Sequence, residues 1–203
     1  MNIKKKVAII TAMEKEYSKA CELAKNPPKG YEIVVELSGI GKVNAAIATQ
    51  KAIYEYSPDL IISFGLAGGL LPNILGDIVS PKRVFYWDVW CGTPNEYGQV
   101  QGLPLFYNCA TDPIIEEWIS KSFNKQISLC ESVGTSDKFA DETVNAKKVE
   151  DIDKYAAAID MECAAVAQVC YKHYVDFMAV KLISDIVGSP NQIEQYKEAL
   201  EKL

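Results

Sequence analysis

Two carboxylic acids stand directly after short apolar runs of the sequence, where α/β sheets usually place ligand-binding residues. Glu14 follows the run Val7–Ile10, and Asp185 follows the run Phe177–Ile183. Because the carboxyl ends of parallel strands meet at one edge of a sheet, we expect the two acids to approach each other. Two further segments follow apolar runs in the same way, the glycine-rich segment 65–69 (GLAGG) and the polar segment 134–139 (GTSDKF).

A third acid, Glu162, lies in the segment Asp160–Ala165 (DMECAA), which opens a predicted helix with apolar residues on nearly every side. Such a helix is mostly buried, and a buried carboxylate needs a partner such as a ligand hydroxyl. An acid in the first turn also complements the helix dipole, so the pattern alone leaves both interpretations open. Taken singly, Glu14 and Asp185 are most simply a helix-start acid and a turn residue. Three acids together would supply a general acid, a group that positions water and an acceptor for sugar hydroxyls, the set required for glycosidic bond hydrolysis.

The segment Ser38–Asn44 (SGIGKVN) is similar to two nucleotide-binding motifs, and its spacing excludes both. A Walker A loop needs glycine at the position of Glu36 and serine or threonine at the position of Val43, and a dinucleotide fingerprint needs glycine at the position of Asn44. What remains is a glycine turn that leads into a helix. Such a turn can bind an anion but more often only redirects the chain.

Composition and charge exclude several classes of function. The 203 residues, 49% apolar and 24% charged, predict one soluble domain spanning residues 1–203. A net charge of −6, with the basic residues spread along the chain, predicts no nucleic-acid or membrane partner. Six irregularly spaced cysteines and one histidine predict no metal site. The basic run 4–6 and the short apolar run after it do not match a signal peptide, so we expect a cytoplasmic protein with reduced thiols.

Short apolar runs alternate with helical patterns along the chain, which predicts an α/β fold with a largely parallel central sheet and helices on both faces. The segment Trp87–Pro104, rich in glycine, proline and aromatic residues, is expected to be a binding loop or an interface, and the last helix a solvated amphipathic one. The predicted strands are Val7–Ile10, Ile33–Leu37, Leu60–Phe64, Ile78–Val79, Ile127–Cys130 and Phe177–Ile183. The predicted helices are Glu14–Lys25, Val43–Tyr56, Pro113–Phe123, Thr143–Lys154, Met161–His173 and Gln192–Leu203.

Several of these motifs occur together in the order and spacing of one known superfamily. They are Ser38–Ala46 (SGIGKVNAA), Gly65–Gly69, Gly76–Val79 (GDIV), Asp160–Ala165 and Ile183–Asp185. In this respect the chain resembles the nucleoside phosphorylase superfamily and, within it, the 5′-methylthioadenosine/S-adenosylhomocysteine nucleosidases. The resemblance implies a three-layer α/β/α fold with a central twisted mixed sheet and a homodimer. It also implies hydrolysis of the N-glycosidic bond of a 5′-modified adenine nucleoside, such as methylthioadenosine or adenosylhomocysteine, without a metal or cofactor.

The resemblance also implies catalytic roles. Asp185 would be the general acid that protonates N7 of the purine, Ser184 would orient it, and Glu14 would position the attacking water. For this role the pKa of Asp185 must be raised, as a water-excluding pocket would do. The surrounding carboxylates would stabilise an oxocarbenium-like sugar.

Other residues would bind the substrate by the same resemblance. Glu162 would accept hydrogen bonds from the ribose hydroxyls, Met161 would pack beneath the sugar, and Phe139 would stack on the base. The backbone at Ala140 would read the edge of the base. In the glycine-rich segment, missing side chains would let the backbone approach the ligand, at Ala67 and Gly68.

Two alternatives stay open on the sequence. Phosphorylases of the superfamily hold phosphate with arginines, and Arg83 is the only arginine here, so water is the expected nucleophile. Lys42 or Lys181 would nevertheless allow a phosphate-dependent phosphorylase. Leu66, where the nucleosidases usually carry serine, and the short segment after Asp185, which offers no clear aromatic residue to cover the 5′ group, would suit a nucleoside-binding or sensor protein with weak catalysis.

Overall fold

Strands and helices alternate along the computed structural model, which describes residues 4–71, 74–140 and 143–203. The predicted elements are present near their expected positions, and several strands extend beyond their apolar runs. The strands are β1 (Lys5–Thr11), β2 (Tyr31–Leu37), β3 (Leu60–Gly69), β4 (Ile78–Tyr86), β5 (Tyr107–Asn108), β6 (Ile127–Thr135), β7 (Ala156–Asp160) and β8 (Asp176–Ile186). The helices are α1 (Glu14–Ala24), α2 (Lys42–Tyr56), α3 (Pro113–Phe123), α4 (Thr143–Ile152), α5 (Cys163–His173) and α6 (Gln192–Lys202).

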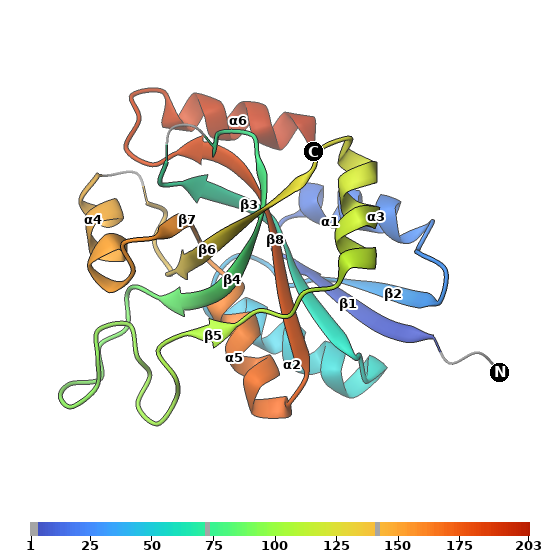
Figure 1. Cartoon of the computed structure of the whole chain (residues 1–203), viewed down its shortest axis with the longest axis horizontal. Helices are drawn as coiled ribbons and strands as arrows, with labels where there is room; N and C mark the ends of the chain where they lie inside the picture. The colour runs from blue at the N-terminus through green and yellow to red at the C-terminus, as the bar shows by residue number, and fades with distance from the viewer. Residues whose placement is uncertain (1–3, 72–73, 141–142) are drawn as a thin grey trace.

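The described strands join in a mixed, strongly bent sheet with β3 at its centre (Figure 1). β1 and β8 run parallel to β3 on its two sides, and β8 pairs antiparallel with β4. β4, β6 and β7 are parallel neighbours, and β7 pairs antiparallel with the last two residues of β3. The pairings therefore close a ring of strands, and the ends of β3, β7 and β8 come together.

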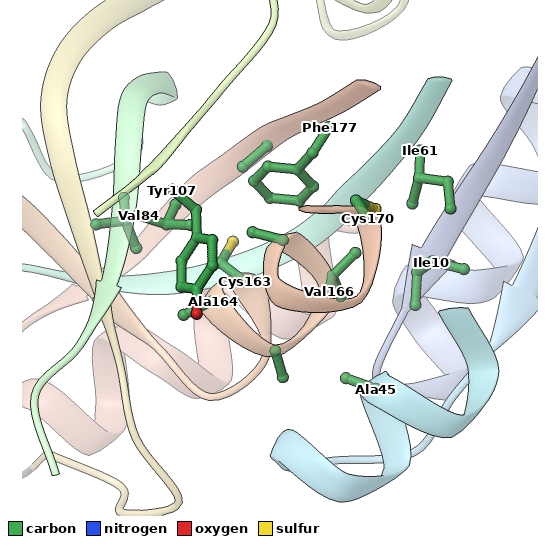
Figure 2. Close-up of a cluster of buried hydrophobic side chains, with 14 of the residues drawn as sticks. Ile10, Ala45, Ile61, Val84, Tyr107, Cys163, Ala164, Val166, Cys170 and Phe177 are labelled. Atoms are coloured by element: carbon green, nitrogen blue, oxygen red, sulfur yellow. The ribbon is translucent and has the colours of Figure 1, made fainter. Parts of the chain in front are cut away.

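Helices α2 and α5 cover one face of the sheet through small side chains. Ala45 of α2 and the buried Cys163, Val166 and Cys170 of α5 belong to one apolar cluster, and Figure 2 shows α5 between α2 and the strands. Small residues let the two helices approach closely, and a buried thiol behaves as a small apolar group. Cys163 and Cys170 therefore serve as small apolar residues of the core.

Helices α1 and α3 cover the opposite face, which completes the three layers. Ala20 and Leu23 of α1 and Ile115 and Ile119 of α3 pack on the sheet in a second apolar cluster. The Asp112 carboxylate accepts hydrogen bonds from the first backbone N–H groups of α3, as its position before a proline predicts. The predicted α/β/α architecture is thus confirmed.

Strand β7 is an element that the sequence analysis missed. Its sequence, Ala156–Asp160 (AAAID), is short and rich in alanine, which is not a strong strand former. Pairing with β6 and with the end of β3 stabilises it. The strand matters for function because it ends on Asp160, directly before the segment that carries Glu162.

The described helices include none that is long and apolar enough to cross a membrane. The six cysteines are free thiols. His173 lies in the last turn of α5, and its Nε2 is 2.8 Å from the Gln50 side-chain oxygen. His173 therefore packs between α5 and α2.

Candidate active site

A cavity opens where the ends of β3, β7 and β8 meet. In the sheet register Gly68 is the partner of both Ile159 of β7 and Asp185 of β8, so the closing of the strand ring creates this meeting point. Eight of the nine predicted site residues line the cavity, and Glu14 does not. The eight are Ala67, Gly68, Phe139, Ala140, Met161, Glu162, Ser184 and Asp185.

Asp185 is almost fully buried on the cavity wall. Its Oδ1 accepts a short hydrogen bond from the Ser184 hydroxyl, and its Oδ2 accepts one from Nε2 of Gln192 at 2.7 Å. A side chain on Gly68 would stand 3.3 Å from Oδ2 and 3.0 Å from Val187, so glycine keeps this approach open. Burial raises the pKa of the Asp185 carboxyl, although the two hydrogen bonds lower it in part. The net effect of this environment is a pKa of the Asp185 carboxyl above its ordinary value.

Glu162 stands at the entrance of α5 and points across the cavity. The helix begins at Cys163, later than predicted, and the Asp160 carboxylate accepts the hydrogen bond from its N–H at 2.9 Å. The Glu162 side chain therefore does not cap the helix. Its Oε1 instead accepts a hydrogen bond from the Gly41 N–H at 2.8 Å. The glycine turn before α2, where Gly41 has φ +97°, therefore serves to hold a carboxylate of the site. Burial, with the nearby charge of Asp160, raises the pKa of Glu162 to about 7.

Glu16 takes the place that we expected for Glu14. Glu14 is exposed on α1, whereas Glu16 is 2% exposed and lines the cavity. The Glu16 carboxylate accepts three backbone hydrogen bonds, from Ala12 and Met13 at 2.9 Å each and from Leu66 at 2.8 Å. The structure therefore puts Glu16, two residues further along the chain, at the position that we expected for Glu14.

The periodicity of α1 explains why Glu16 and not Glu14 reaches the cavity. Glu16, Ala20 and Leu23 are its buried residues, and they share the helix face that meets the sheet. Glu14 lies two residues before Glu16, roughly 200° around the helix at 3.6 residues per turn. The apolar positions of the helix, followed back to its first turn, would have selected Glu16. Glu14 was expected at the site because it is the acid nearest to the end of the strand.

Glycine at position 65 is a condition for this placement of Glu16. A Cβ atom there would collide with the Glu16 carboxylate, so glycine leaves the space that this carboxylate occupies beside β3. Leu66 contributes through its backbone, because its N–H holds the Glu16 Oε1. The leucine side chain at this position therefore removes none of the support for Glu16.

Lys181 and Asp160 form a buried ion pair behind the cavity wall. Their Nζ and Oδ2 atoms are 3.0 Å apart, and the Thr135 hydroxyl donates to the other Asp160 oxygen at 2.6 Å. Burial alone would lower the pKa of Lys181, but the acidic groups around it, including Cys163, Asp160 and Glu162, outweigh burial and raise it. Burial would likewise raise the pKa of Asp160, yet Lys181 and the hydrogen bonds hold it below its usual value.

Two residues of α6, Gln192 and Tyr196, also line the cavity, and the sequence analysis named neither for the site. Gln192 is 4% exposed and is the one buried residue of α6, whose other residues are exposed or half-buried, as expected for a solvated amphipathic helix. The Tyr196 ring meets the half-exposed Phe139 ring edge to face, with centroids 5.8 Å apart. Tyr196 thus places an aromatic residue from the segment after Asp185 at the cavity. Tyr196 lies four residues after Gln192, about one helix turn, so the two side chains share one face of α6. This spacing is the feature of the sequence that could have pointed to both residues.

The two lysines that would have allowed phosphate binding form ion pairs with carboxylates of the chain. Lys42 forms ion pairs with Asp88 at 2.7 Å and Asp137 at 3.4 Å, and Lys181 is bound to Asp160. Within residues 4–71, 74–140 and 143–203, Lys138 is the one basic residue that lines the cavity.

Comparison with known proteins agrees with this geometry. The chain matches the family model of the Phosphorylase superfamily over residues 6–203. It is 32% identical to the 5′-methylthioadenosine/S-adenosylhomocysteine nucleosidase of Marinomonas sp. (strain MWYL1), over 93% of this chain and 84% of that protein. This chain belongs to that nucleosidase family.

Solved structures of the nucleosidase family share its fold. The nucleosidase of Neisseria meningitidis, in complex with methylthio-immucillin-A, superposes with a TM-score of 0.85 at 28% identity, covering 97% of this chain and 92% of that one. The nucleosidase of Colwellia psychrerythraea 34H, in complex with adenine, gives a TM-score of 0.84 at 28% identity, covering 98% and 89%. The family is one of N-glycosyl hydrolases, and its members in these two structures bind nucleoside-like ligands or adenine.

Proposed function

We propose that this chain hydrolyses the N-glycosidic bond of 5′-modified adenine nucleosides of the methylthioadenosine and adenosylhomocysteine type. The observation that carries the proposal is the meeting of Glu16, Glu162 and Asp185 in one cavity. The three acids come from distant parts of the sequence, so residues 1–203 would act as one domain. The free thiols suit the reducing cytoplasm, where we place the reaction.

Asp185 would act on the leaving base. Its carboxyl donates a proton to N7 of the purine, and the bond between C1′ and N9 breaks with its electron pair moving to the base. Adenine then leaves as a neutral molecule. The burial that raises the pKa of Asp185 supports this role, and the Ser184 hydroxyl orients the carboxyl.

Glu16 and Glu162 would act on the sugar side. The oxygen of a water molecule adds to C1′, and Glu16 accepts the proton that the water loses. The negative charge of the carboxylates stabilises the positive charge that develops on the ribose in the transition state. Glu162, fixed by the Gly41 N–H, would accept hydrogen bonds from the ribose hydroxyls. The proton gained by Glu16 returns to Asp185 through solvent before the next turnover.

The remaining cavity residues would bind the nucleoside. Phe139 would stack on the base, the backbone at Ala140 would read its edge, and Met161 would lie beneath the sugar. The backbone of the β3 end, at Ala67 and Gly68, leaves room for the ligand beside Asp185. Apolar side chains at the cavity, Met13 and Ile40, suit a thioether substituent at the 5′ position.

Assays in phosphate-free buffer test the reaction. We expect methylthioadenosine and adenosylhomocysteine to release adenine and a free 5-thio-substituted ribose at a rate that phosphate does not change. Turnover that needs phosphate and yields ribose 1-phosphate would replace hydrolysis by phosphorolysis. Saturable binding of adenine without any product would indicate that the chain is a nucleoside-binding protein. The pairing of Lys42 and Lys181 with carboxylates supports water as the nucleophile.

We also propose that two copies of the chain form a homodimer through helix α2. An apolar stripe is exposed along the start and outer face of this helix, and soluble monomers rarely leave such a surface uncovered. Beside it, Trp90 and Tyr97 of the loop 87–104 are exposed and stacked, and the ion pair of Asp88 with Lys42 ties this loop to α2. We expected this loop to be either a binding loop or an interface. Because the loop does not line the cavity, the interface is favoured. The stripe consists of Ile40, Val43, Ile47 and Tyr54.

Light scattering after size-exclusion chromatography tests the dimer. We expect twice the mass of the chain for the unchanged protein and the mass of one chain for the double variant V43E/I47E, because charges on the stripe oppose its burial. A control with Lys121→Glu, an exposed position of α3 on the other face of the sheet, should stay dimeric. A monomer at all concentrations of the unchanged protein would rule the interface out.

A further inference from the structure

Gln192 joins two cavity atoms that come from different parts of the fold. Its Nε2 donates to Oδ2 of Asp185 at 2.7 Å and to the backbone carbonyl oxygen of Ala140 at 2.8 Å. Its Oε1 accepts from the Gly188 N–H at 2.8 Å. The side chain is nearly fully buried and its hydrogen-bonding atoms all have partners. A carboxamide NH₂ has two hydrogens, and both are used here.

The orientation of this carboxamide is fixed by its partners. If the oxygen and nitrogen were exchanged, the amide oxygen would face the two acceptors at Asp185 and Ala140, and the NH₂ group would face the Gly188 N–H. Both contacts would be repulsive. The two acceptors thus converge on a single NH₂ group, and together they form a receptor for an amino group.

The exocyclic amine of an aminopurine is the same kind of group, a planar NH₂ with two donor hydrogens. We propose that the Gln192 amide is an internal ligand of this amino subsite, and that the 6-amino group of the substrate's base displaces it on binding. This inference rests on the proposed function. It adds that the free protein holds the subsite closed and that Gln192 lowers the affinity for 6-aminopurines.

The position of Asp185 supports the displacement. In a purine the 6-amino group and N7 lie side by side on one edge of the base. A base that takes a proton from Asp185 at N7 therefore brings its amino group next to the same carboxyl, where Nε2 of Gln192 now lies. Nε2 of Gln192 already bonds to both the Asp185 and the Ala140 acceptor, so we infer that the amide moves away when the base enters.

Gln195 offers a matched control on the same helix. Its Oε1 accepts from the Ile186 N–H at 2.9 Å, so it fastens α6 to the strand end much as Gln192 does through Gly188. Gln195 does not line the cavity and has no hydrogen bond to Asp185 or Ala140. Replacing it weakens the attachment of α6 and leaves the amino subsite occupied.

Calorimetric titration of two bases tests the proposal, adenine and unsubstituted purine, which lacks the amino group. For Gln192→Ala we expect adenine to bind on the order of tenfold more tightly than to the unchanged protein, because a site closed by an internal ligand binds in proportion to its open fraction. Purine places no amino group in the subsite, so its affinity should change less than about twofold. Gln195→Ala should leave the ratio of the two affinities unchanged.

Three results would overturn the inference. Adenine that binds Gln192→Ala more weakly, with purine unchanged, would mean that Gln192 helps to hold the base. A parallel weakening of both bases would assign Gln192 a purely structural role. The absence of adenine binding together with the absence of hydrolysis would instead refute the proposed function, and the inference with it.

A second measurement needs no variant that must fold. The side-chain amide protons of glutamine are visible by NMR in the ¹⁵N-labelled protein, and those of Gln192 should exchange slowly with solvent while they are bonded. Adenine should shift these signals and speed their exchange, and purine should not. Unchanged Gln192 signals at saturating adenine would show that the amide stays in place, while the proposed hydrolysis would remain supported.

Discussion

The Lys181 ammonium and the Asp160 carboxylate lie 3.0 Å apart and are almost completely buried, on β8 and β7, the two strands that flank the end of β3 at the cavity. Asp160 also accepts hydrogen bonds from the Thr135 hydroxyl and the Cys163 N–H, so its oxygens are well partnered. The pair thus fixes the end of β7 and the entrance of α5. Glu162 comes from that entrance, so the ion pair supports a residue of the site that it does not touch.

Lys181→Met is expected to destabilise the protein strongly, because it leaves the Asp160 charge buried without its partner. Breaking a buried ion pair in this way costs about 3–5 kcal/mol, which corresponds to a fall in melting temperature on the order of 10 °C for a chain of this size. Thermal and urea unfolding measure the loss.

Lys82→Met is the matched control, since Lys82 forms an ion pair with Glu131 at 2.9 Å on the exposed surface. We expect a change below about 1 kcal/mol there. Removing the second charge, in K181M/D160N, should recover part of the loss. Equal effects of the two lysine replacements would contradict the role given to the buried pair.

Glu16→Gln is expected to lower kcat at least about 100-fold, the effect of removing a general base, because an amide cannot accept the proton of the attacking water. Glu14→Gln should leave kcat within about twofold, since Glu14 is exposed and outside the cavity. Steady-state release of adenine from methylthioadenosine measures both. A greater loss in the Glu14 variant would restore the assignment that the sequence suggested.

Asp185→Asn is expected to reduce kcat by about 100-fold or more and to change KM only a few-fold, since an amide keeps the shape but cannot supply the proton to N7. Asp176 begins the same strand and is exposed, so Asp176→Asn is the control and should behave as the unchanged protein. Normal turnover in the Asp185 variant would remove this residue from the acid role.

Stability should fall as the pH rises from about 4.5 to 7, because the pKa of Glu162 is about 7 in the folded protein and its ordinary value is 4.5. Between these values the folded state holds a proton that the unfolded state has lost, so the stabilisation is complete below pH 4.5 and is lost as the pH passes through 7. Its size is roughly 3 kcal/mol at 1.36 kcal/mol per pKa unit.

Urea unfolding of the unchanged protein and of Glu162→Gln, at several pH values between 4.5 and 8, isolates this contribution. Glutamine at this position cannot titrate, so the difference in unfolding free energy between the two proteins should change in favour of the variant as the pH rises. A difference that does not vary with pH would show that Glu162 is ionised throughout.

The strands and helices were predictable because the apolar runs and helical patterns are local in the sequence. Asp112 and Pro113 set the start of α3 through their own backbone chemistry, and the structure confirms it. Strand β7 was not predictable, because its alanine-rich segment is a strand only through pairing with β6 and β3. The resemblance to a known family predicted more of the architecture than periodicity did, because the order of the motifs along the chain reflects how the strands are connected.

The sequence by itself determined that acids and glycines stand at the ends of strands, and therefore which edge of the sheet carries the cavity. Only the tertiary structure decided between Glu14 and Glu16, because the choice depends on which face of α1 meets the sheet. It alone placed Gln192 against Asp185, since a contact between a helix turn and a strand end depends on how the two pack. Spacing along the chain sets what each element can present, and packing sets which side chains meet.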